Sequence, residues 1–547
     1  MNKLDTTIQF GVLIVGTIGL ATIFGIYLAR MITFEMRPLE RTLARVESGF
    51  YRVIGINATK QMSWKEYFLA LFVTNMVVVI FIILVLTFQN CLLLSEGKEG
   101  FSFDLAFNTA ISFITDTNLQ HYVGDQQLSI TSQMIAITFT MFIAPSSGIA
   151  AAFAFIRSFI RKNYGLGNFY VDMVRIIVTL LLPVSVVSAL VLMVIGVPQT
   201  LEPFVETNTL EGVINNNSSN SQTINMGPVA SLQSIKELGS NGGGFFGSNS
   251  GHPFENPTGL SNMYEMFLML IIPLSFPIAY AKLMGKGKGV SILVTMLVGF
   301  GIMLVISTST EIDPMLLETR FGSFGSALFD TVSLATNTGA VNSALAGMSP
   351  EAITSFFLGM FVQAIPGAVG TGMMMMIVFV LLTLFLVGLM VGKTPEFMSM
   401  KISPRDIRLA VYIFLLHPAL ILIPTVIAMG TGNAQAIVGN QVDSMAFTQT
   451  FYEYASSAAN NGSNYFGASA DTPFWNYSTA IVMFLGRYLP LALLLAIAGS
   501  FTMKDRKEVI EPIKTQGPLF ITVLITVTFL LTALTFFPFI ILGPFSI

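Results

Sequence analysis

Four short polar stretches of the chain are rich in Asn, Gly, Ser and Thr, residues that offer oxygen atoms without carrying charge. Gly242, Gly243, Gly339 and Gly462 lie in three of them. Glycine adopts positive φ without a Cβ clash, so successive backbone carbonyls can turn toward one point. Carbonyl rings of this kind replace the hydration shell of a potassium ion. The predicted chemistry is therefore coordination of a monovalent cation by neutral oxygen atoms.

Each polar stretch follows a short amphipathic segment and lies between two apolar segments. A helix of about ten residues is too short to cross a bilayer, so the unit fits a re-entrant pore helix and loop. Non-helical backbone at membrane depth must be buried in protein or line a water-filled cavity. One such turn is more often an ordinary surface connection, but four at the same place in a repeated unit indicate a shared role. The units, in which Asn118, Asn241, Asn337 and Asn461 mark corresponding points, are residues 105–120, 228–244, 326–340 and 447–463.

The composition places these units in a membrane protein. Of the 547 residues, 53% are hydrophobic and 10% are charged, whereas soluble domains contain about 25% charged residues. The net charge of −3 gives no reason to expect a nucleic-acid partner, and the single cysteine, Cys91, excludes an internal disulfide. A spanning helix needs about 20 mostly apolar residues. Ten segments qualify: residues 8–29, 67–94, 128–156, 176–197, 266–281, 290–310, 352–392, 409–429, 474–500 and 518–542.

These segments predict an all-α membrane protein with about ten transmembrane helices. We expect residues 1–547 to form a single membrane domain, in which four pseudo-symmetric helix–pore loop–helix repeats surround one selectivity filter. The repeats are residues 67–156, 176–281, 290–392 and 409–500, and the extra spans at the two ends are residues 8–29 and 518–542.

The basic residues predict the orientation. Of the 27 Lys and Arg residues, 22 lie in alternate loops, residues 30–65, 157–175, 282–288, 393–408 and 504–514. The positive-inside rule makes these loops cytoplasmic. Both termini and all four polar stretches are then expected on the outer side of a multi-pass cell-membrane protein.

Two features inside the spans point to a transport pathway. Residues 352–392 are uncharged and exceed the length of one span, and the centre of this segment, residues 365–372, contains a proline and three glycines that should break a helix. Broken helices at mid-membrane commonly line a pathway, although a plain kink between two packed pieces is the alternative. Arg487 is the one basic residue well inside a span, where charge is costly and usually faces a polar cavity or a partner. If that span ends earlier, Arg487 lies at the membrane interface instead.

Several motifs resemble the KdpA family, the potassium subunits of prokaryotic potassium-transporting P-type ATPases. The longest match, residues 240–258, reads Ser-Asn-Gly-Gly-Gly-Phe-Phe-Gly-Ser-Asn-Ser-Gly-His-Pro-Phe-Glu-Asn-Pro-Thr and is highly specific. Shorter matches are residues 227–231, 336–342, 392–397, 456–463 and 516–520. The family is related to the Trk, Ktr and HKT potassium channels. The resemblance implies four pore repeats around one filter, an inner-membrane location and a complex with the ATP-hydrolysing subunit KdpB and with KdpC and KdpF.

Carried over by position, the resemblance implies a potassium filter in the four polar stretches and a gating loop below it. Arg487 is expected to contact the gating loop and to act as an electrostatic barrier. The implied gating residues are Pro366, Gly367, Gly370, Gly372 and Arg487. The implied filter residues are Thr115, Asp116, Thr117, Asn118, Gln120, Ser240, Asn241, Gly242, Gly243, Thr336, Asn337, Thr338, Gly339, Asn460, Asn461 and Gly462.

Two filter positions depart from the family pattern. Asp116 stands where a neutral Asn is more usual, and Gln120 replaces the glycine of the other loops. A carboxylate at position 116 would either raise cation affinity or face away into solvent. We expect Asp116 to face solvent, because an uncompensated buried charge is costly.

The favoured function is therefore the binding of external potassium and its conduction across the membrane, as the non-catalytic, channel-like subunit of an ATP-driven uptake complex. The alternatives are a stand-alone channel and a transporter driven by an ion gradient. The second would need acidic residues at mid-membrane depth, and the sequence shows none well inside a span. No nucleotide is expected to bind, since the glycine spacing before Lys393 and Thr394 is one residue too short for a phosphate loop.

Overall fold

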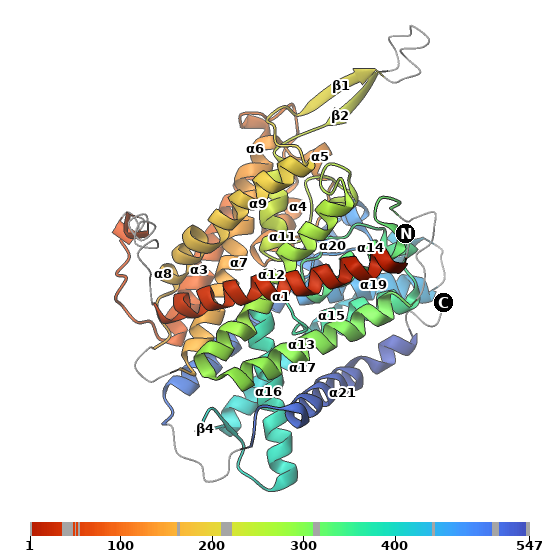
Figure 1. Ribbon diagram of the computed structural model, residues 1–547. Helices are drawn as coiled ribbons and strands as arrows, with labels where there is room; N and C mark the ends of the chain where they lie inside the picture. The colour runs from red at the N-terminus through yellow and green to blue at the C-terminus, as the bar shows by residue number, and fades with distance from the viewer. Residues whose placement is uncertain are drawn as a thin grey trace.

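The computed structural model describes residues 3–34, 47–49, 51–52, 55–160, 165–208, 221–309, 318–439, 443–505 and 513–542. Seven of the basic residues used for orientation lie outside these ranges: Arg37, Arg41, Arg45, Arg161, Lys162, Arg506 and Lys507. The described chain is mostly helical (Figure 1).

Ten helices of the described chain are long and apolar enough to cross a membrane, which confirms the predicted number. Two of them contain a π-helical stretch: α6 (Ile130–Ser132) runs through Gln133–Thr138 into α7 (Phe139–Arg157), and α8 (Phe169–Ile176) runs through Ile177–Leu181 into α9 (Leu182–Ile195). The other eight are α1 (Lys3–Thr33), α3 (Trp64–Thr87), α12 (Gly259–Met284), α13 (Lys286–Ser307), α16 (Thr371–Val391), α17 (Pro404–Gly430), α20 (Pro473–Thr502) and α21 (Pro518–Leu542).

Large apolar side chains are exposed along these helices, as expected where lipid replaces water. Val15, Leu69, Val194, Val305 and Val426 are all more than half exposed. Contiguous apolar surface of this kind marks a membrane-facing protein. The chain is therefore a multi-pass membrane protein.

Four shorter helices fill the interior between the spans. They are α4 (Phe103–Ile114), α11 (Val229–Leu238), α14 (Gly322–Ala335) and α19 (Asp443–Ala459). Most of their described residues are buried, although Phe103 at the start of α4 is 61% exposed. Each packs against neighbouring spans: α4 against α3 and α20, α11 against α9 and α12, α14 against α12 and α13, and α19 against α17 and α20. These helices correspond to the amphipathic segments that precede the four polar stretches.

The predicted break in the long uncharged segment is present. α15 (Pro350–Val362) ends at Gln363, which adopts a left-handed conformation with φ of 53°, and α16 begins only at Thr371. Residues 363–370 between them form a largely buried loop, called the gating loop below after the role predicted for it. Its Gly367 N–H donates to the Ala335 carbonyl at 2.9 Å, so the loop lies against the end of α14.

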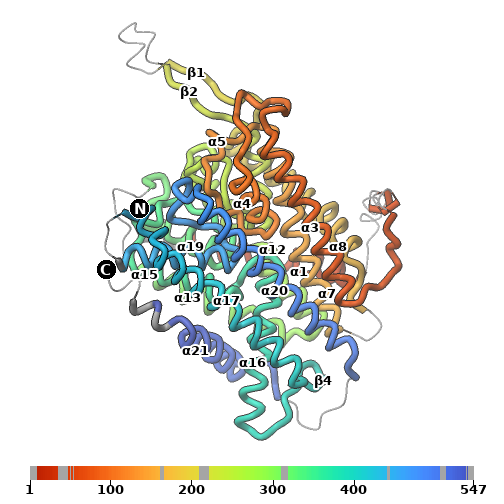
Figure 2. Tube along the Cα trace, turned by 180° about the vertical axis from the view of Figure 1, so that it is seen from behind, coloured from red at the N-terminus to blue at the C-terminus, as the bar shows by residue number. Residues whose placement is uncertain are grey.

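The other elements are small. A hairpin of β1 (Phe204–Asn208) and β2 (Ser221–Asn225), with Phe204 opposite Asn225, projects from the body (Figures 1 and 2). β3 (Glu396–Phe397) pairs with β4 (Met400–Lys401). α5 (Gly124–Gln127), α18 (Asn433–Val438) and four 3₁₀ turns, Gln89–Cys91, Asn249–Gly251, Leu345–Gly347 and Gly467–Ala470, complete the chain. The start of α1 and the end of α21 lie on the same side of the body in both views.

A fully buried ion pair ties four of the spanning helices together. Arg157, at the end of α7, donates from both terminal nitrogens to Asp172 in α8, at 2.7 and 2.8 Å. Its Nε–H donates to the Ile32 carbonyl of α1 at 2.7 Å, and the Tyr67 hydroxyl of α3 donates to the same Asp172 at 2.8 Å. Both charged side chains are essentially unexposed (0% and 1%), so each charge depends on this set of partners.

Candidate cation site between four loops

The four short helices end in the same way. In each, the first residue after the cap is a non-glycine in the left-handed region: Asp116 (φ 63°), Ser240 (55°), Asn337 (52°) and Asn460 (54°). The next residue donates its N–H to the carbonyl five positions back, the bond that defines a Schellman cap. These bonds are Thr117 to Ser112 at 3.0 Å, Asn241 to Lys236 at 2.9 Å, Thr338 to Ser333 at 2.8 Å and Asn461 to Ser456 at 2.9 Å.

The shared cap sets which residues correspond, and it corrects the sequence alignment. Asn118, Asn241, Asn337 and Asn461 do not occupy one position, since Asn337 is the left-handed residue of its loop and Asn118 lies two residues beyond that point in its own loop. The equivalent residues are Asp116, Ser240, Asn337 and Asn460, called the cap ring below. Asparagine is common throughout these loops, so residue type alone could not fix the register.

The polar stretches that follow α4, α11, α14 and α19, called loops 1 to 4 in this order together with the residues beside them, converge around Gly242. A Cβ placed on Gly242 would lie 2.7 Å from the Thr338 carbonyl oxygen, 3.0 Å from that of Thr117 and 3.2 Å from that of Asn461. One point beside loop 2 is thus within 3.2 Å of a backbone carbonyl oxygen from each of the other three loops. The structure therefore brings the predicted filter stretches together, with a backbone carbonyl oxygen from each of three of them close to Gly242 of the fourth.

Two other glycines show how closely neighbouring loops approach. A Cβ on Gly462 would lie 1.9 Å from the Thr117 carbonyl oxygen, and one on Gly339 would lie 1.9 Å from that of Asn461. Both glycines also have positive φ, 98° and 78°, which side chains rarely tolerate. These two positions therefore admit no side chain without displacing the carbonyls of the centre.

Many polar side chains of the predicted filter stretches support the loops, whereas the Asn118 and Ser240 side chains have no hydrogen-bond partner among the described residues. The Thr115 and Thr117 hydroxyls bond to each other at 2.8 Å, and those of Thr336 and Thr338 at 2.7 Å. The amide side chains reach across to neighbouring elements. Asn241 Nδ2 donates to the Met141 carbonyl, Asn337 Nδ2 to that of Ala459, and Asn460 Nδ2 to the Thr117 hydroxyl.

Two buried carboxylates that the sequence analysis did not identify hold the chain that follows loops 3 and 4 by accepting hydrogen bonds from it. In loop 3, Asp330 accepts from the Asn342 N–H at 3.1 Å and from the Ser343 hydroxyl. In loop 4, Glu453 accepts from the Tyr465 and Phe466 N–H groups. Asp330 and Glu453 each precede the cap-ring residue of their loop by seven positions, and that spacing was the available signal.

Loop 2 is braced by a buried ion pair. Lys236 Nζ lies 2.8 Å from Glu255 and 3.4 Å from Glu237, and all three side chains are fully buried. The other oxygen of Glu255 accepts from the Phe246 N–H at 2.8 Å, shortly after the carbonyl centre. Lys236 also donates to Asn249 and Ser250, so its ammonium is saturated.

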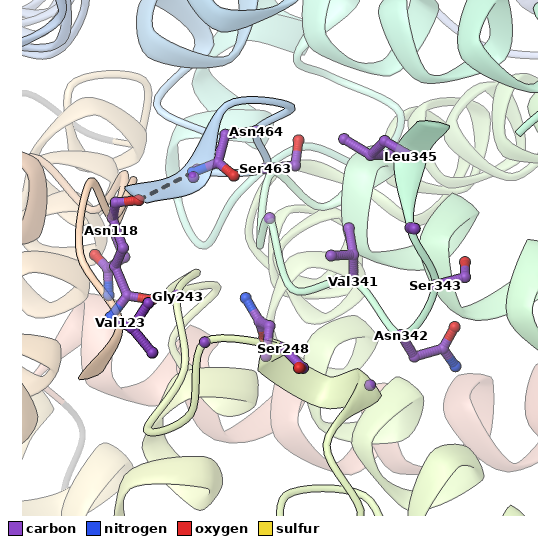
Figure 3. A pocket seen from close by; sticks show the side chains of 18 of the residues that line it. Asn118, Val123, Gly243, Ser248, Val341, Asn342, Ser343, Leu345, Ser463 and Asn464 are labelled. Carbon is purple, nitrogen blue, oxygen red and sulfur yellow. Dashed lines mark hydrogen bonds between the residues drawn. The ribbon is translucent and has the colours of Figure 1, made fainter. Parts of the chain in front are cut away.

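A cavity of about 550 Å³ lies against one end of the four loops (Figure 3). Asn118, Gly243, Gly339 and Gly462 line it, whereas the cap ring does not. Of the described lining residues only Glu318 is charged; a hydrogen bond from Arg320 lowers the pKa of Glu318 and keeps it ionised. The cavity is thus lined mainly by neutral polar groups and backbone, a suitable vestibule for a cation that is losing water.

Gln120, the second departure from the family pattern, links loops at this rim. Its Oε1 accepts from the Gly244 N–H at 2.9 Å, and its Nε2 donates to the Gly244 carbonyl at 3.0 Å. Asn464 of loop 4 donates in turn to the Gln120 carbonyl at 3.3 Å. The Gln120 side chain therefore links loop 1 to loop 2 through two hydrogen bonds.

The opposite end of the loops faces Arg487 and the gating loop. Arg487 is buried with its side chain only 5% exposed, which excludes the interface alternative. Its Nη2 donates to Asp116 and to the Ala144 carbonyl, both at 3.3 Å. A Cβ on Gly148 would lie 2.9 Å from this Nη2 and 3.4 Å from the Val369 carbonyl oxygen, so the guanidinium sits beside the gating loop. The direct contact expected with residues 366–372 is not among its hydrogen bonds to described residues.

The expectation that Asp116 faces solvent is wrong. Its side chain is 1% exposed and forms an ion pair with Arg487. The buried charge of Asp116 is compensated by Arg487, which lies 371 residues away and could not be paired with it from the sequence.

Comparisons with known proteins identify the family of the chain. A family model described as the potassium-transporting ATPase A subunit, KdpA, matches residues 11–546. A potassium-transporting ATPase potassium-binding subunit from Caldanaerobacter subterraneus subsp. tengcongensis is 40% identical over 535 residues, with 94% of each chain covered. The crystal structure of the potassium transporter TrkH from Vibrio parahaemolyticus superposes with a TM-score of 0.52 at 16% identity, covering 91% of this chain and all of that one, which shows a shared fold. The chain therefore belongs to the KdpA family of potassium-transporting ATPase A subunits.

Proposed function

We propose that this chain binds potassium from the outer side and conducts it across the membrane, as the channel-like subunit of an ATP-driven uptake complex. The observation that carries the proposal is the centre at Gly242, which three backbone carbonyl oxygens from the other three loops approach within 3.2 Å. The site residues are those of the four filter stretches, with the backbone of Thr117, Gly242, Thr338 and Asn461 nearest the ion.

The oxygen set favours a large monovalent cation over a small divalent one. Magnesium demands oxygens at about 2.0–2.1 Å and calcium at about 2.3–2.6 Å, usually with carboxylates among the ligands. The three atoms nearest a Cβ on Gly242 are instead all neutral backbone carbonyl oxygens, and no carboxylate oxygen is among them. Neutral carbonyl dipoles can compensate for the free-energy cost of removing water from a weakly hydrated ion such as potassium.

The short helices add to this preference. All four end where the loops converge, so their partly negative C-terminal ends point toward the centre. The four loops differ in sequence and in the buried side chains that support them. We therefore infer a single potassium site and not a row of several equivalent sites. We infer that residues 67–156, 176–281, 290–392 and 409–500 are four repeats of one unit around this site.

The proposed path runs from the outer cavity through the carbonyl centre to the gating loop. Pro366, Gly367, Gly370 and Gly372 shape that loop, and Arg487 beside it acts as an electrostatic barrier to a bare cation. Its support is the position of Arg487 between Asp116, Ala144 and the Gly148–Val369 contact.

The partner assignment follows from the family. The relative from Caldanaerobacter is named as a subunit of a potassium-transporting ATPase, so we propose that a separate P-type subunit, KdpB, hydrolyses ATP and that KdpC and KdpF complete an inner-membrane complex. No nucleotide is assigned to this chain, and both termini are placed on the outer side. Co-purification from native membranes tests this assignment. An associated P-type ATPase supports it, and a chain that transports potassium without one supports a stand-alone channel.

Rubidium binding to the purified complex tests the filter directly. Gly242→Asp puts a side chain where three carbonyl oxygens converge and should abolish rubidium binding and uptake. Gly259→Asp is the matched control, because a Cβ there meets nothing within 4 Å and an acid in the first turn of a helix is favourable. Binding by Gly242→Asp that equals the parent would disprove the filter assignment.

A further inference from the structure

The cap ring is neutral at three positions and charged at the fourth. Ser240, Asn337 and Asn460 carry no charge, whereas Asp116 carries a carboxylate paired with the Arg487 guanidinium. The backbone carbonyl of the next residue, Thr117, is one of the three that converge on the centre at Gly242. Any net charge on this pair therefore acts on a cation at that centre through little intervening protein.

The Asp116–Arg487 ion pair rests on a single long contact. One arginine nitrogen reaches one carboxylate oxygen at 3.3 Å, longer than the about 2.7–2.9 Å of a strong charge-assisted bond. The second oxygen, Asp116 Oδ1, is buried and has no hydrogen-bond partner among the described residues. A pair held this weakly can separate without breaking a larger hydrogen-bond network.

The surroundings provide space for the guanidinium. Gly148 of α7 lies beside it, and a Cβ at that position would come within 2.9 Å of Arg487 Nη2. The Ala144 carbonyl accepts from the same nitrogen at 3.3 Å. The arginine thus rests between α7, the gating loop and the cap ring, held in part by Asp116.

We propose that Asp116 raises the cation affinity of the site above that of a neutral residue at this position, by offsetting the charge of Arg487 beside the carbonyl centre. With the pair intact, the carboxylate offsets the Arg487 charge at the carbonyl centre and favours a potassium ion there, while the guanidinium still faces the gating loop as the barrier proposed above. Without the carboxylate, the guanidinium stands alone beside the path and repels the ion. This inference rests on the proposed function, because it assigns Asp116 a role at the proposed potassium site.

A charge-rescue experiment on the purified complex tests the inference. Asp116→Asn keeps the size of the side chain and introduces the residue that two other loops carry at the same cap position, so the fold should be retained. We expect rubidium to bind about tenfold more weakly, the scale of one uncompensated charge close to a site. Adding Arg487→Gln should restore binding to within about threefold of the parent, because the two charges are coupled.

The controls separate this inference from the proposed function. If the parent complex fails to bind rubidium, the proposed function is wrong. If the parent binds and Asp116→Asn binds equally well, the carboxylate does not tune the site and the inference is overturned. A double variant weaker than Asp116→Asn would also overturn it, because a purely structural role predicts accumulated damage in place of rescue. Thermal unfolding of each variant shows whether the fold is retained.

Discussion

Two buried Arg–Asp pairs in this chain differ sharply in how completely they are satisfied. Arg157–Asp172 is bidentate at 2.7 and 2.8 Å, with further partners from Ile32 and Tyr67. Arg487–Asp116 is a single contact at 3.3 Å, and one carboxylate oxygen has no described partner. Ala144, which contacts Arg487, and Arg157 belong to the same helix, about 20 Å apart along its axis at 1.5 Å per residue.

If the further inference holds, the difference separates a structural pair from one that acts on the bound ion. A charge in a low-dielectric interior needs all its hydrogen bonds, and the pair far from the filter has them. The pair beside the proposed filter lacks part of this hydrogen bonding. Completeness of hydrogen bonding, more than burial, therefore distinguishes the two roles.

Removing the acid of the complete pair should have the largest effect. Asp172→Asn leaves the Arg157 charge buried without its counter-ion, and arginine cannot lose its proton to relieve the cost. We expect a loss of about 3–5 kcal/mol in the free energy of unfolding, measured by thermal or denaturant unfolding in detergent. The fraction that remains folded should bind rubidium with the affinity of the parent.

The exposed pair Lys60–Glu66 is the control, because its side chains are 56% and 48% exposed. Lys60→Met should change the free energy of unfolding by no more than about 0.5 kcal/mol. If Asp172→Asn were equally harmless, or if it weakened rubidium binding in the folded protein, the division between the two pairs would fail.

The Lys236–Glu255 pair is fully hydrogen-bonded, as Arg157–Asp172 is, but it supports one of the proposed filter loops. It therefore shows whether complete hydrogen bonding or position near the filter decides the effect on rubidium binding. Lys236→Met leaves Glu237 and Glu255 without a counter-ion, but carboxylates can take up a proton, so we expect a smaller loss of about 2–3 kcal/mol in unfolding free energy. Because Glu255 also holds the Phe246 N–H of loop 2, rubidium affinity should fall in the folded variant as well. Unchanged affinity would mean that this pair supports the fold alone.

Substituting Gln120, which forms uncharged hydrogen bonds at the rim of the cavity, should have the smallest effect of these variants on stability. Gln120→Ala removes two hydrogen bonds between loop 1 and loop 2, each contributing about 0.5–1.5 kcal/mol. We expect rubidium affinity to fall about fivefold and the unfolding temperature to change little. Gln120→Glu sharpens the result, because a carboxylate accepts from the Gly244 N–H but cannot donate to its carbonyl. If both variants bind like the parent, Gln120 is not a structural link of the filter.

The sequence predicted what depends on local pattern. Ten apolar segments became ten long helices, the Pro366–Gly372 region broke its helix, and the four polar stretches came together. What failed depends on distant partners. The fate of Asp116 was decided by Arg487, 371 residues away, and the braces at Asp330 and Glu453 serve backbone groups twelve positions further along the chain. Residue type shows that such a group needs a partner, but only the fold supplies it.

The central claim is that four unlike loops hold one dehydrated potassium ion among their carbonyl oxygens. Anomalous diffraction from crystals of the complex soaked in rubidium or thallium tests it most directly. The account predicts one strong anomalous peak among the Thr117, Thr338 and Asn461 carbonyls beside Gly242, and no such peak in Gly242→Asp. A strong peak elsewhere in the chain, with none at this centre, would contradict it.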